Sequence, residues 1–190
     1  MSSKDYYQVV LAKVLLCGAF AVGKTSLVLR YVDGIFSADT IQTLGANFLK
    51  KSLEHKGPNN RLYKVEMQLW DLSGTIRSAE SISRTFFMGT SGVLFVYDLT
   101  RKWTLNEIPS WYESVKAVSP QFIPIIVGNK ADLEKKRETT AEDAQNIAQQ
   151  IGAKKVFETS AKSGEYVEEA FAKLAEFLLS EFAEVGRARS

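Results

Sequence analysis

The sequence predicts a single α/β domain with three layers, in which a mostly parallel, six-stranded sheet lies between two layers of helices. About five helices are expected in total. Short apolar runs alternate with amphipathic segments along the whole chain, which is the pattern of consecutive strand and helix units. Three of the runs are almost continuously apolar, as expected for strands buried on both faces of a parallel sheet. The length of 190 residues suits one domain. In such folds ligands bind beyond the carboxyl ends of the strands, so functional residues are expected there.

Six strands are predicted in chain order, over residues 12–17, 45–53, 63–70, 92–97, 123–127 and 155–158. The third alternates between apolar and polar residues, as a half-exposed strand does. The turn residues at 57–60, which read GPNN, predict a hairpin that joins it to the second strand. One strand of the sheet is therefore expected to run antiparallel to the others.

Five helices are predicted over residues 24–32, 79–88, 105–118, 141–151 and 167–182. The last shows the clearest helical periodicity, and the apolar stripe that should pack on the sheet contains Val167, Ala170, Phe171, Leu174, Phe177, Leu178 and Phe182. We expect one domain over residues 1–190, with short flexible termini at 1–10 and 183–190.

Composition excludes several classes of protein. The net charge of +2 gives no electrostatic reason for nucleic-acid binding. No apolar run approaches the roughly 20 residues of a membrane helix. The single cysteine, Cys17, excludes an internal disulfide. The sequence has no signal-peptide pattern at its start and no prenylation cysteine in residues 186–190. We expect a cytoplasmic protein that reaches a membrane only through a partner or a missing tail.

A phosphate-binding loop follows the first predicted strand, where residues 18–25 read GAFAVGKT and match the pattern GxxxxGK[ST]. The glycines let successive backbone N–H groups face phosphate oxygens, and the next helix adds its positive N-terminal dipole. Lys24 supplies a cation, and the hydroxyl of Thr25 is a ligand for Mg²⁺. The residues expected at the phosphates are Ala21, Val22, Gly23, Lys24, Thr25 and Ser26.

Two more motifs follow the fifth and sixth predicted strands, where residues 128–132 read GNKAD and residues 159–162 read TSAK. A carboxylate such as Asp132 can accept hydrogen bonds from both the N1–H and the 2-amino group of guanine. Adenine has no such pair of donors on that edge, so Asp132 favours a guanine nucleotide. It also disfavours the alternative of an adenylate-type kinase.

With the phosphate loop, these motifs resemble the Ras superfamily of small GTPases, in particular its Rab-like and Ras-like members, over nearly the whole chain. The resemblance implies the G-domain version of the P-loop NTPase fold. It implies that Asn129 and Asp132 hold guanine, that Lys130 packs on its face, that the Ala161 N–H meets its carbonyl oxygen and that Phe36 stacks over base and ribose. The full set implied at the base is Phe36, Asn129, Lys130, Asp132, Ser160, Ala161 and Lys162.

The resemblance also implies two switch segments that read the γ-phosphate. Thr43 would bind Mg²⁺ through its hydroxyl and the phosphate through its N–H, with Thr40 as the less favoured alternative because of its spacing from Gly45. Asp71 would hold Mg²⁺ through water, so the metal set is Thr25, Thr43 and Asp71. The Gly74 N–H would sense the phosphate. Loss of the γ-phosphate would release both segments, which makes the protein a molecular switch.

The sequence departs from this family at two positions. Thr75, followed by Ile76, stands where most members carry a glutamine that orients the attacking water. Loss of that side chain costs roughly one or more powers of ten in rate. Phe20 stands where a small residue is usual, so its ring either obstructs a partner's arginine or is simply exposed. The expected activity is slow hydrolysis of GTP to GDP, with the catalytic set Lys24, Thr43, Gly74 and Thr75.

Three interpretations stay open at this point. Thr75 and Phe20 also fit a scaffold that holds nucleotide constantly and hardly hydrolyses it. Arg77 and Arg84 are candidates for an arginine that acts in cis, and spacing alone places neither. The implied partners are effector, exchange and activating proteins, which would contact the switches and an aromatic trio. The trio is either exposed for these partners or buried in the core, and it consists of Phe48, Trp70 and Phe86.

Overall fold

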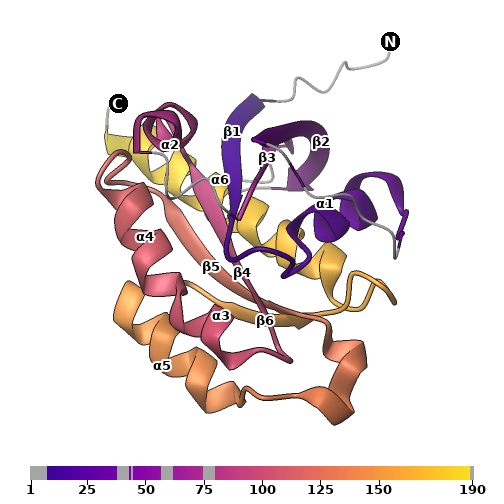
Figure 1. Cartoon of the computed structure of the whole chain (residues 1–190). Coiled ribbons are helices and arrows are strands. Elements are labelled where there is room, and N and C mark those ends of the chain that lie inside the picture. Colours follow the sequence, from indigo (N-terminus) through magenta and orange to yellow (C-terminus); the bar gives the residue numbers. More distant parts are fainter. Residues whose placement is uncertain (1–7, 38–42, 44, 57–61, 75–79, 189–190) are drawn as a thin grey trace.

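The computed structural model describes residues 8–37, 43, 45–56, 62–74 and 80–188. Their backbone forms one six-stranded sheet with the strand order β2-β3-β1-β4-β5-β6 (Figure 1). All neighbouring strands pair in parallel except β2 and β3, which are antiparallel as predicted. The strands are β1 (Gln8–Cys17), β2 (Ala46–Lys56), β3 (Leu62–Leu72), β4 (Gly92–Asp98), β5 (Ile123–Asn129) and β6 (Val156–Thr159).

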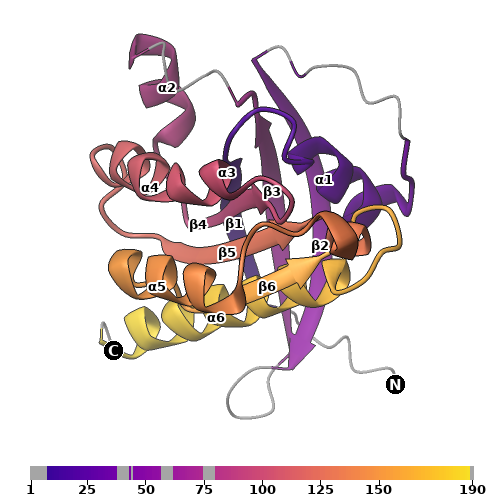
Figure 2. The same ribbon diagram turned by 60° about the horizontal axis from the view of Figure 1, so that its bottom comes forward.

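Helices cover both faces of this sheet, which confirms the three-layer prediction (Figure 2). The helices α1 (Lys24–Asp33) and α6 (Val167–Ala188) pack on one face. The opposite face carries α2 (Glu80–Phe87), α3 (Lys102–Asn106), α4 (Ile108–Lys116) and α5 (Ala141–Ile151). A short 3-10 helix, η3, occupies Ala131–Lys136.

The helix predicted over 105–118 is wrong in its extent, because the structure contains two helices there. α3 begins earlier, at Lys102, and α4 begins at Ile108. Pro109 lies in the first turn of α4. A proline lacks the N–H that a continuing helix needs and fits only the first turn of a new one, which explains the break. The described residues therefore form six α-helices rather than five.

Both ends of the described chain are more regular than predicted. β1 starts at Gln8, four residues before the predicted start, because it pairs with β3 from that residue onward. α6 continues to Ala188, beyond the predicted end at 182. Most of the predicted apolar stripe of α6 is buried, but Phe182 is 40% exposed, so its inclusion in the stripe was wrong.

The topology brings functional segments together at the carboxyl ends of β1, β4, β5 and β6. The phosphate loop follows β1, and the two base motifs follow β5 and β6. No helix among the described residues is long and apolar enough to cross a membrane.

Candidate functional site

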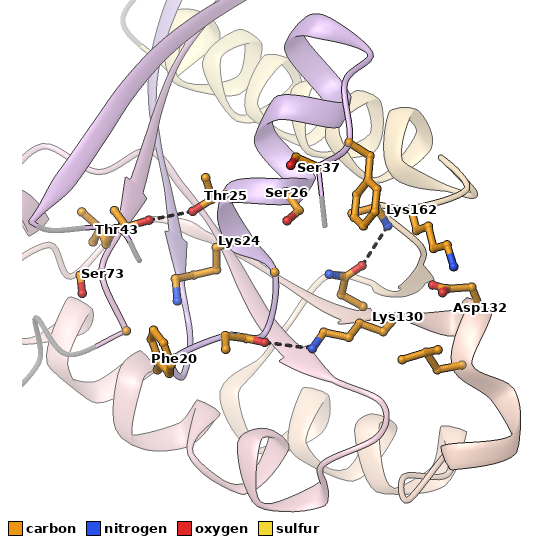
Figure 3. A pocket seen from close by; sticks show the side chains of 18 residues that line it. Phe20, Lys24, Thr25, Ser26, Ser37, Thr43, Ser73, Lys130, Asp132 and Lys162 are labelled. Atoms are coloured by element: carbon orange, nitrogen blue, oxygen red, sulfur yellow. Dashed lines mark hydrogen bonds between the residues drawn. The ribbon is translucent and has the colours of Figure 1, made fainter. Parts of the chain in front are cut away.

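A cavity of about 480 Å³ lies at these strand ends, within the size range of small-molecule sites. Figure 3 shows Lys24, Thr25 and Thr43 towards one end of it and Asp132 and Lys162 towards the other. Thirteen of the predicted site residues line the cavity: Ala21, Gly23, Lys24, Thr25, Ser26, Phe36, Thr43, Gly74, Asn129, Lys130, Asp132, Ala161 and Lys162.

Three predicted residues lie behind the cavity wall instead. Val22 and Ser160 are fully buried, and Asp71 is reached through the threonine hydroxyls described below. Others lie outside the described residues: Thr40, Thr75, Ile76 and Arg77. Arg84, near the end of α2, is exposed and does not line the cavity.

Lys24 is fixed at the floor of the phosphate loop. Its side chain is almost completely buried, and Nζ donates hydrogen bonds to the carbonyl oxygens of Gly18 at 2.7 Å and Ala19 at 2.9 Å. Burial lowers the pKa of Lys24 to about 8, and the nearby Asp71 carboxylate opposes this shift. The loop thus holds an ammonium group beside the first turn of α1, where backbone N–H groups also favour an anion.

Gly23 and Gly74 are required by close packing of three segments. Gly23 has φ +97°, and a Cβ there would lie 2.3 Å from Nδ2 of Asn129. A Cβ on Gly74 would lie 2.4 Å from the backbone N of Phe20. Gly74, at the end of the Asp-x-x-Gly segment, therefore lies directly against the phosphate loop. The Phe20 side chain is 48% exposed and also contributes to the cavity wall.

Three oxygen-bearing side chains gather near Lys24. The hydroxyl of Thr25 donates to Oδ2 of Asp71 at 2.5 Å and lies 2.8 Å from the Thr43 hydroxyl, which is 3.3 Å from the same carboxylate oxygen. Burial raises the pKa of Asp71, against the lowering effect of the Thr25 hydrogen bond and of Lys24. Thr43, the favoured candidate, thus lies in this cluster.

The donor set of this cluster fits Mg²⁺. The Oδ1 atom of Asp71 is buried and has no hydrogen-bond partner among the described residues. A buried carboxylate oxygen without a partner is unusual in a folded protein. Carboxylate and hydroxyl oxygens are the hard ligands that Mg²⁺ prefers.

Asn129 joins the phosphate loop to the base motifs. It is buried, its Nδ2 donates to the carbonyl oxygen of Val22 at 2.9 Å, and its Oδ1 accepts from the N–H of Ala161 at 3.1 Å. The Ala161 N–H, expected to meet the carbonyl oxygen of a base, thus has a partner within the protein. Asn129 aligns the two loops as well as lining the cavity.

Ser160 orients Asp132. Its hydroxyl donates to Oδ1 of Asp132 at 2.6 Å and accepts from the N–H of Ser163 at 3.0 Å. Ser160 itself is fully buried, whereas Asp132 is exposed, so the hydrogen bond links a fixed hydroxyl to a carboxylate at the surface of the cavity. Ser160, which the sequence analysis assigned to the site, therefore positions Asp132 and does not itself line the cavity.

Lys130 belongs to a network that sequence reasoning missed. Its Nζ lies 2.7 Å from Oδ2 of the buried Asp98 and donates to the carbonyl oxygen of Ala21 at 3.0 Å. Arg101 also contacts both groups, with Nε 2.9 Å from Asp98 Oδ2 and Nη2 2.8 Å from the Ala21 carbonyl oxygen. Ala21 has φ +58°, an unusual conformation for a non-glycine residue, and two cations hold its carbonyl group. The signal in the sequence was a charged residue, Asp98, at the carboxyl end of an apolar strand.

The aromatic trio forms one contiguous group on β2, β3 and α2. The ring centroids of Phe48 and Trp70 are 5.2 Å apart in a T-shaped arrangement, and those of Trp70 and Phe86 are 6.0 Å apart. Phe48 is 46% exposed, whereas Trp70 and Phe86 are half-buried. The rings are therefore partly core and partly surface.

Comparisons with known proteins show the family of this chain. A sequence model of the Ras family matches residues 13–180. The Ras-related protein Rab-4 of Dictyostelium discoideum is 37% identical over 171 residues, which cover 90% of this chain and 80% of that protein. Rab-19 of Rattus norvegicus is 35% identical over 90% of this chain and 76% of its own length, and Rab-13 of Bos taurus is 35% identical over 89% and 80%. The chain therefore belongs to the Ras family of small GTPases, and its relatives include Rab proteins.

Proposed function

We propose that the protein is a molecular switch that binds GTP and GDP together with Mg²⁺, hydrolyses GTP slowly and signals to effector proteins through its switch segments. The observation that carries this proposal is the set of groups in and just behind the wall of one cavity. The wall contains a lysine-bearing phosphate loop, two threonines and a carboxylate suited to guanine, and a carboxylate with an unpartnered oxygen lies directly behind the threonines.

At the base end, Asp132 would accept hydrogen bonds from the N1–H and 2-amino groups of guanine. The Ser160 hydroxyl supports this role because it fixes the direction of the carboxylate. Phe36 and Lys130 would cover the two faces of the base, and the Ala161 N–H would be shared between Asn129 and the base oxygen.

At the phosphate end, Lys24 and the loop N–H groups would bind the β- and γ-phosphates. Thr25 and Thr43 would hold Mg²⁺ directly and Asp71 would hold it through water. The bound ion would neutralise charge that develops on the phosphate oxygens. The N–H groups of Thr43 and Gly74 would contact the γ-phosphate, so its loss would release both switch segments.

Slow hydrolysis is proposed because Thr75 cannot reach and orient water as a glutamine does. The second candidate, a scaffold that binds nucleotide constantly with negligible hydrolysis, is favoured by the same residue and by the Phe20 ring at the cavity wall. The variant Thr75→Gln separates them. Single-turnover hydrolysis about tenfold faster than in the wild type supports an attenuated enzyme, whereas an unchanged rate argues against glutamine loss as the limiting defect.

Effector proteins are proposed to contact the surface formed by Phe48, Trp70 and Phe86, next to the switch segments. Exposed aromatic rings are frequent anchors in protein interfaces, and the contiguous packing of this trio supports that use.

The binding part of the proposal is tested by equilibrium titration with fluorescent GDP and ADP, with Mg²⁺ or with excess EDTA. We expect tight binding of GDP, no comparable binding of ADP, and weaker GDP binding in EDTA. Lys24→Ala should abolish binding, while Lys116→Ala, a lysine of α4 outside the cavity wall, should not change it. Equal affinity for ADP and GDP would overturn the proposal.

A further inference from the structure

Arg30 joins two walls of the cavity without lining it. It lies in the last turn of α1 and its side chain is half-buried. Nε donates to the carbonyl oxygen of Ala161 at 2.8 Å, and Nη2 donates to that of Lys162 at 2.7 Å. Nη1 donates to the carbonyl oxygen of Gly34, at the exit from α1, at 2.8 Å. α1 and the segment between β6 and α6 lie side by side in both Figure 1 and Figure 2.

The first wall is the loop that contains Ala161 and Lys162. This loop is bonded internally, because the N–H groups of Ser163 and Gly164 donate to the hydroxyl and the carbonyl oxygen of Ser160. Ser160 in turn orients Asp132. The hydrogen bonds from Arg30 to this loop therefore also help to fix Asp132, the residue proposed to recognise guanine.

The second wall begins at Gly34, which ends α1 with φ +70°. Phe36 follows two residues later and also lines the cavity. Because Arg30 bonds Gly34 as well as the loop, movement of either wall away from the other would break at least one of its hydrogen bonds.

An arginine is the side chain that can make these three contacts at once. Its planar guanidinium carries five N–H donors in a fixed arrangement, whereas a lysine offers a single nitrogen. Three donors here reach three carbonyl oxygens on two segments that are far apart in the sequence.

We propose that Arg30 is a positioning residue that ties the base-binding loop to the root of the first switch segment and thereby sets how long a guanine nucleotide stays bound. This inference rests on the proposed function. Under it, nucleotide leaves when the wall carrying Phe36 and the loop carrying Ala161 separate, and Arg30 resists that separation.

The test is the release rate of fluorescent GDP, chased with excess GDP in Mg²⁺, from the wild type and from Arg30→Gln. We expect release about tenfold or more faster from the variant, because a glutamine cannot satisfy all three carbonyl groups. Arg137→Gln is the matched control. This variant breaks a bidentate ion pair with Glu158 that lies outside the cavity wall. It should leave the release rate within about twofold of the wild-type rate.

A second readout separates positioning from a general loss of structure. Thr25 and Thr43 lie at the end of the cavity away from Lys162, as Figure 3 shows. EDTA should therefore accelerate release by the same factor in Arg30→Gln and in the wild type. Arg30→Lys, which keeps the charge and one donor nitrogen, should show an intermediate rate, and it carries the test if the glutamine variant does not fold.

Wild-type release rates in both Arg30 variants would overturn the inference while leaving nucleotide binding intact. A changed EDTA factor in these variants would also overturn it, because the effect would then reach the metal end. Failure of the wild type to bind fluorescent GDP would overturn the proposed function itself, and the inference with it.

Discussion

At the scale of single residues, Asp132 is the residue proposed to discriminate between bases. Its carboxylate lines the cavity and is oriented by Ser160 at 2.6 Å. The hydroxyl contact leaves acceptor capacity on both carboxylate oxygens, as two parallel donors on guanine require. Neither neighbouring loop offers another carboxylate to the described cavity wall.

Asp132→Asn should lower the affinity for GDP roughly a hundredfold or more, because two hydrogen bonds to a charged acceptor are lost. The same variant should bind xanthosine diphosphate better than the wild type does, since the new amide can donate to the 2-carbonyl group of xanthine. Competition against fluorescent GDP measures both effects. Glu134→Gln, an exposed change in the same 3-10 helix, is the control and should leave both affinities unchanged.

The Asp98 carboxylate stabilises the end of β4 and the phosphate loop together. Burial alone would raise the pKa of Asp98, but hydrogen bonds from Lys130 and Thr100 outweigh it and hold that pKa below its usual value of 3.8. The folded state thus favours the ionised form. This contribution to stability is complete above the unfolded-state pKa and is lost as the pH falls through the lower folded-state value.

Asp98→Asn should lower the free energy of unfolding at pH 7 by about 3 kcal/mol, because it leaves Lys130 and Arg101 without their buried partner. The difference from the wild type should shrink below about pH 4 as Asp98 becomes protonated. Thermal unfolding of both proteins between pH 7 and pH 3 measures this. A difference that stays constant over the whole range would contradict the role given to the charge.

At the scale of elements, α6 holds α1 and hence the phosphate loop on the sheet. The rings of Tyr31 in α1 and Phe171 in α6 stack with centroids 4.0 Å apart and planes 2° apart. Phe171 is 1% exposed, whereas Phe182 in the same helix is 40% exposed. The two phenylalanines therefore make a matched pair for a test of packing.

Phe171→Ala should reduce the free energy of unfolding by about 3–5 kcal/mol, the usual cost of removing a buried aromatic ring. Phe182→Ala should change it by less than about 1 kcal/mol. Denaturant titration of the nucleotide-free proteins gives both values. Equal losses in the two variants would show that the packing of α6 has been assigned incorrectly.

Sequence patterns predicted the elements well where a periodic signal is strong. All six strands and the antiparallel β2–β3 pair were found, because alternation and turn residues are local properties. The break between α3 and α4 was missed, although Pro109 marks it. Burial of Phe182 was predicted wrongly because periodicity does not say where the neighbouring sheet ends.

Prediction of the site was also limited to features that local sequence determines. Motif residues such as Lys24, Thr25 and Asp132 could be predicted because their spacing is local. The contacts of Arg30 with Ala161 and of Arg101 with Ala21 could not, because these partners lie 131 and 80 positions away in the sequence. Contacts of that kind depend on the order of the strands in the sheet, which no short motif encodes.

At the scale of the whole molecule, we propose a switch in which the two ends of the cavity have different tasks. Asp132 and its supporting loop are proposed to select the base, while Thr25, Thr43 and Asp71 form the cluster proposed to hold Mg²⁺. Asn129 and the Asp98 network connect these ends through the phosphate loop. Binding and hydrolysis are thereby expected to depend on one connected structure.

The most direct test of the central claim is to load the protein with GTP and Mg²⁺ and to follow bound GTP and GDP by chromatography for about two days. We predict that GTP is retained and converted to GDP with a rate constant on the order of 10⁻⁵ s⁻¹, below that of family members with the glutamine. Lys24→Ala should retain no nucleotide. Bound GTP that is still unconverted after two days would contradict slow hydrolysis and favour the scaffold, and a protein that retains no guanine nucleotide would contradict both.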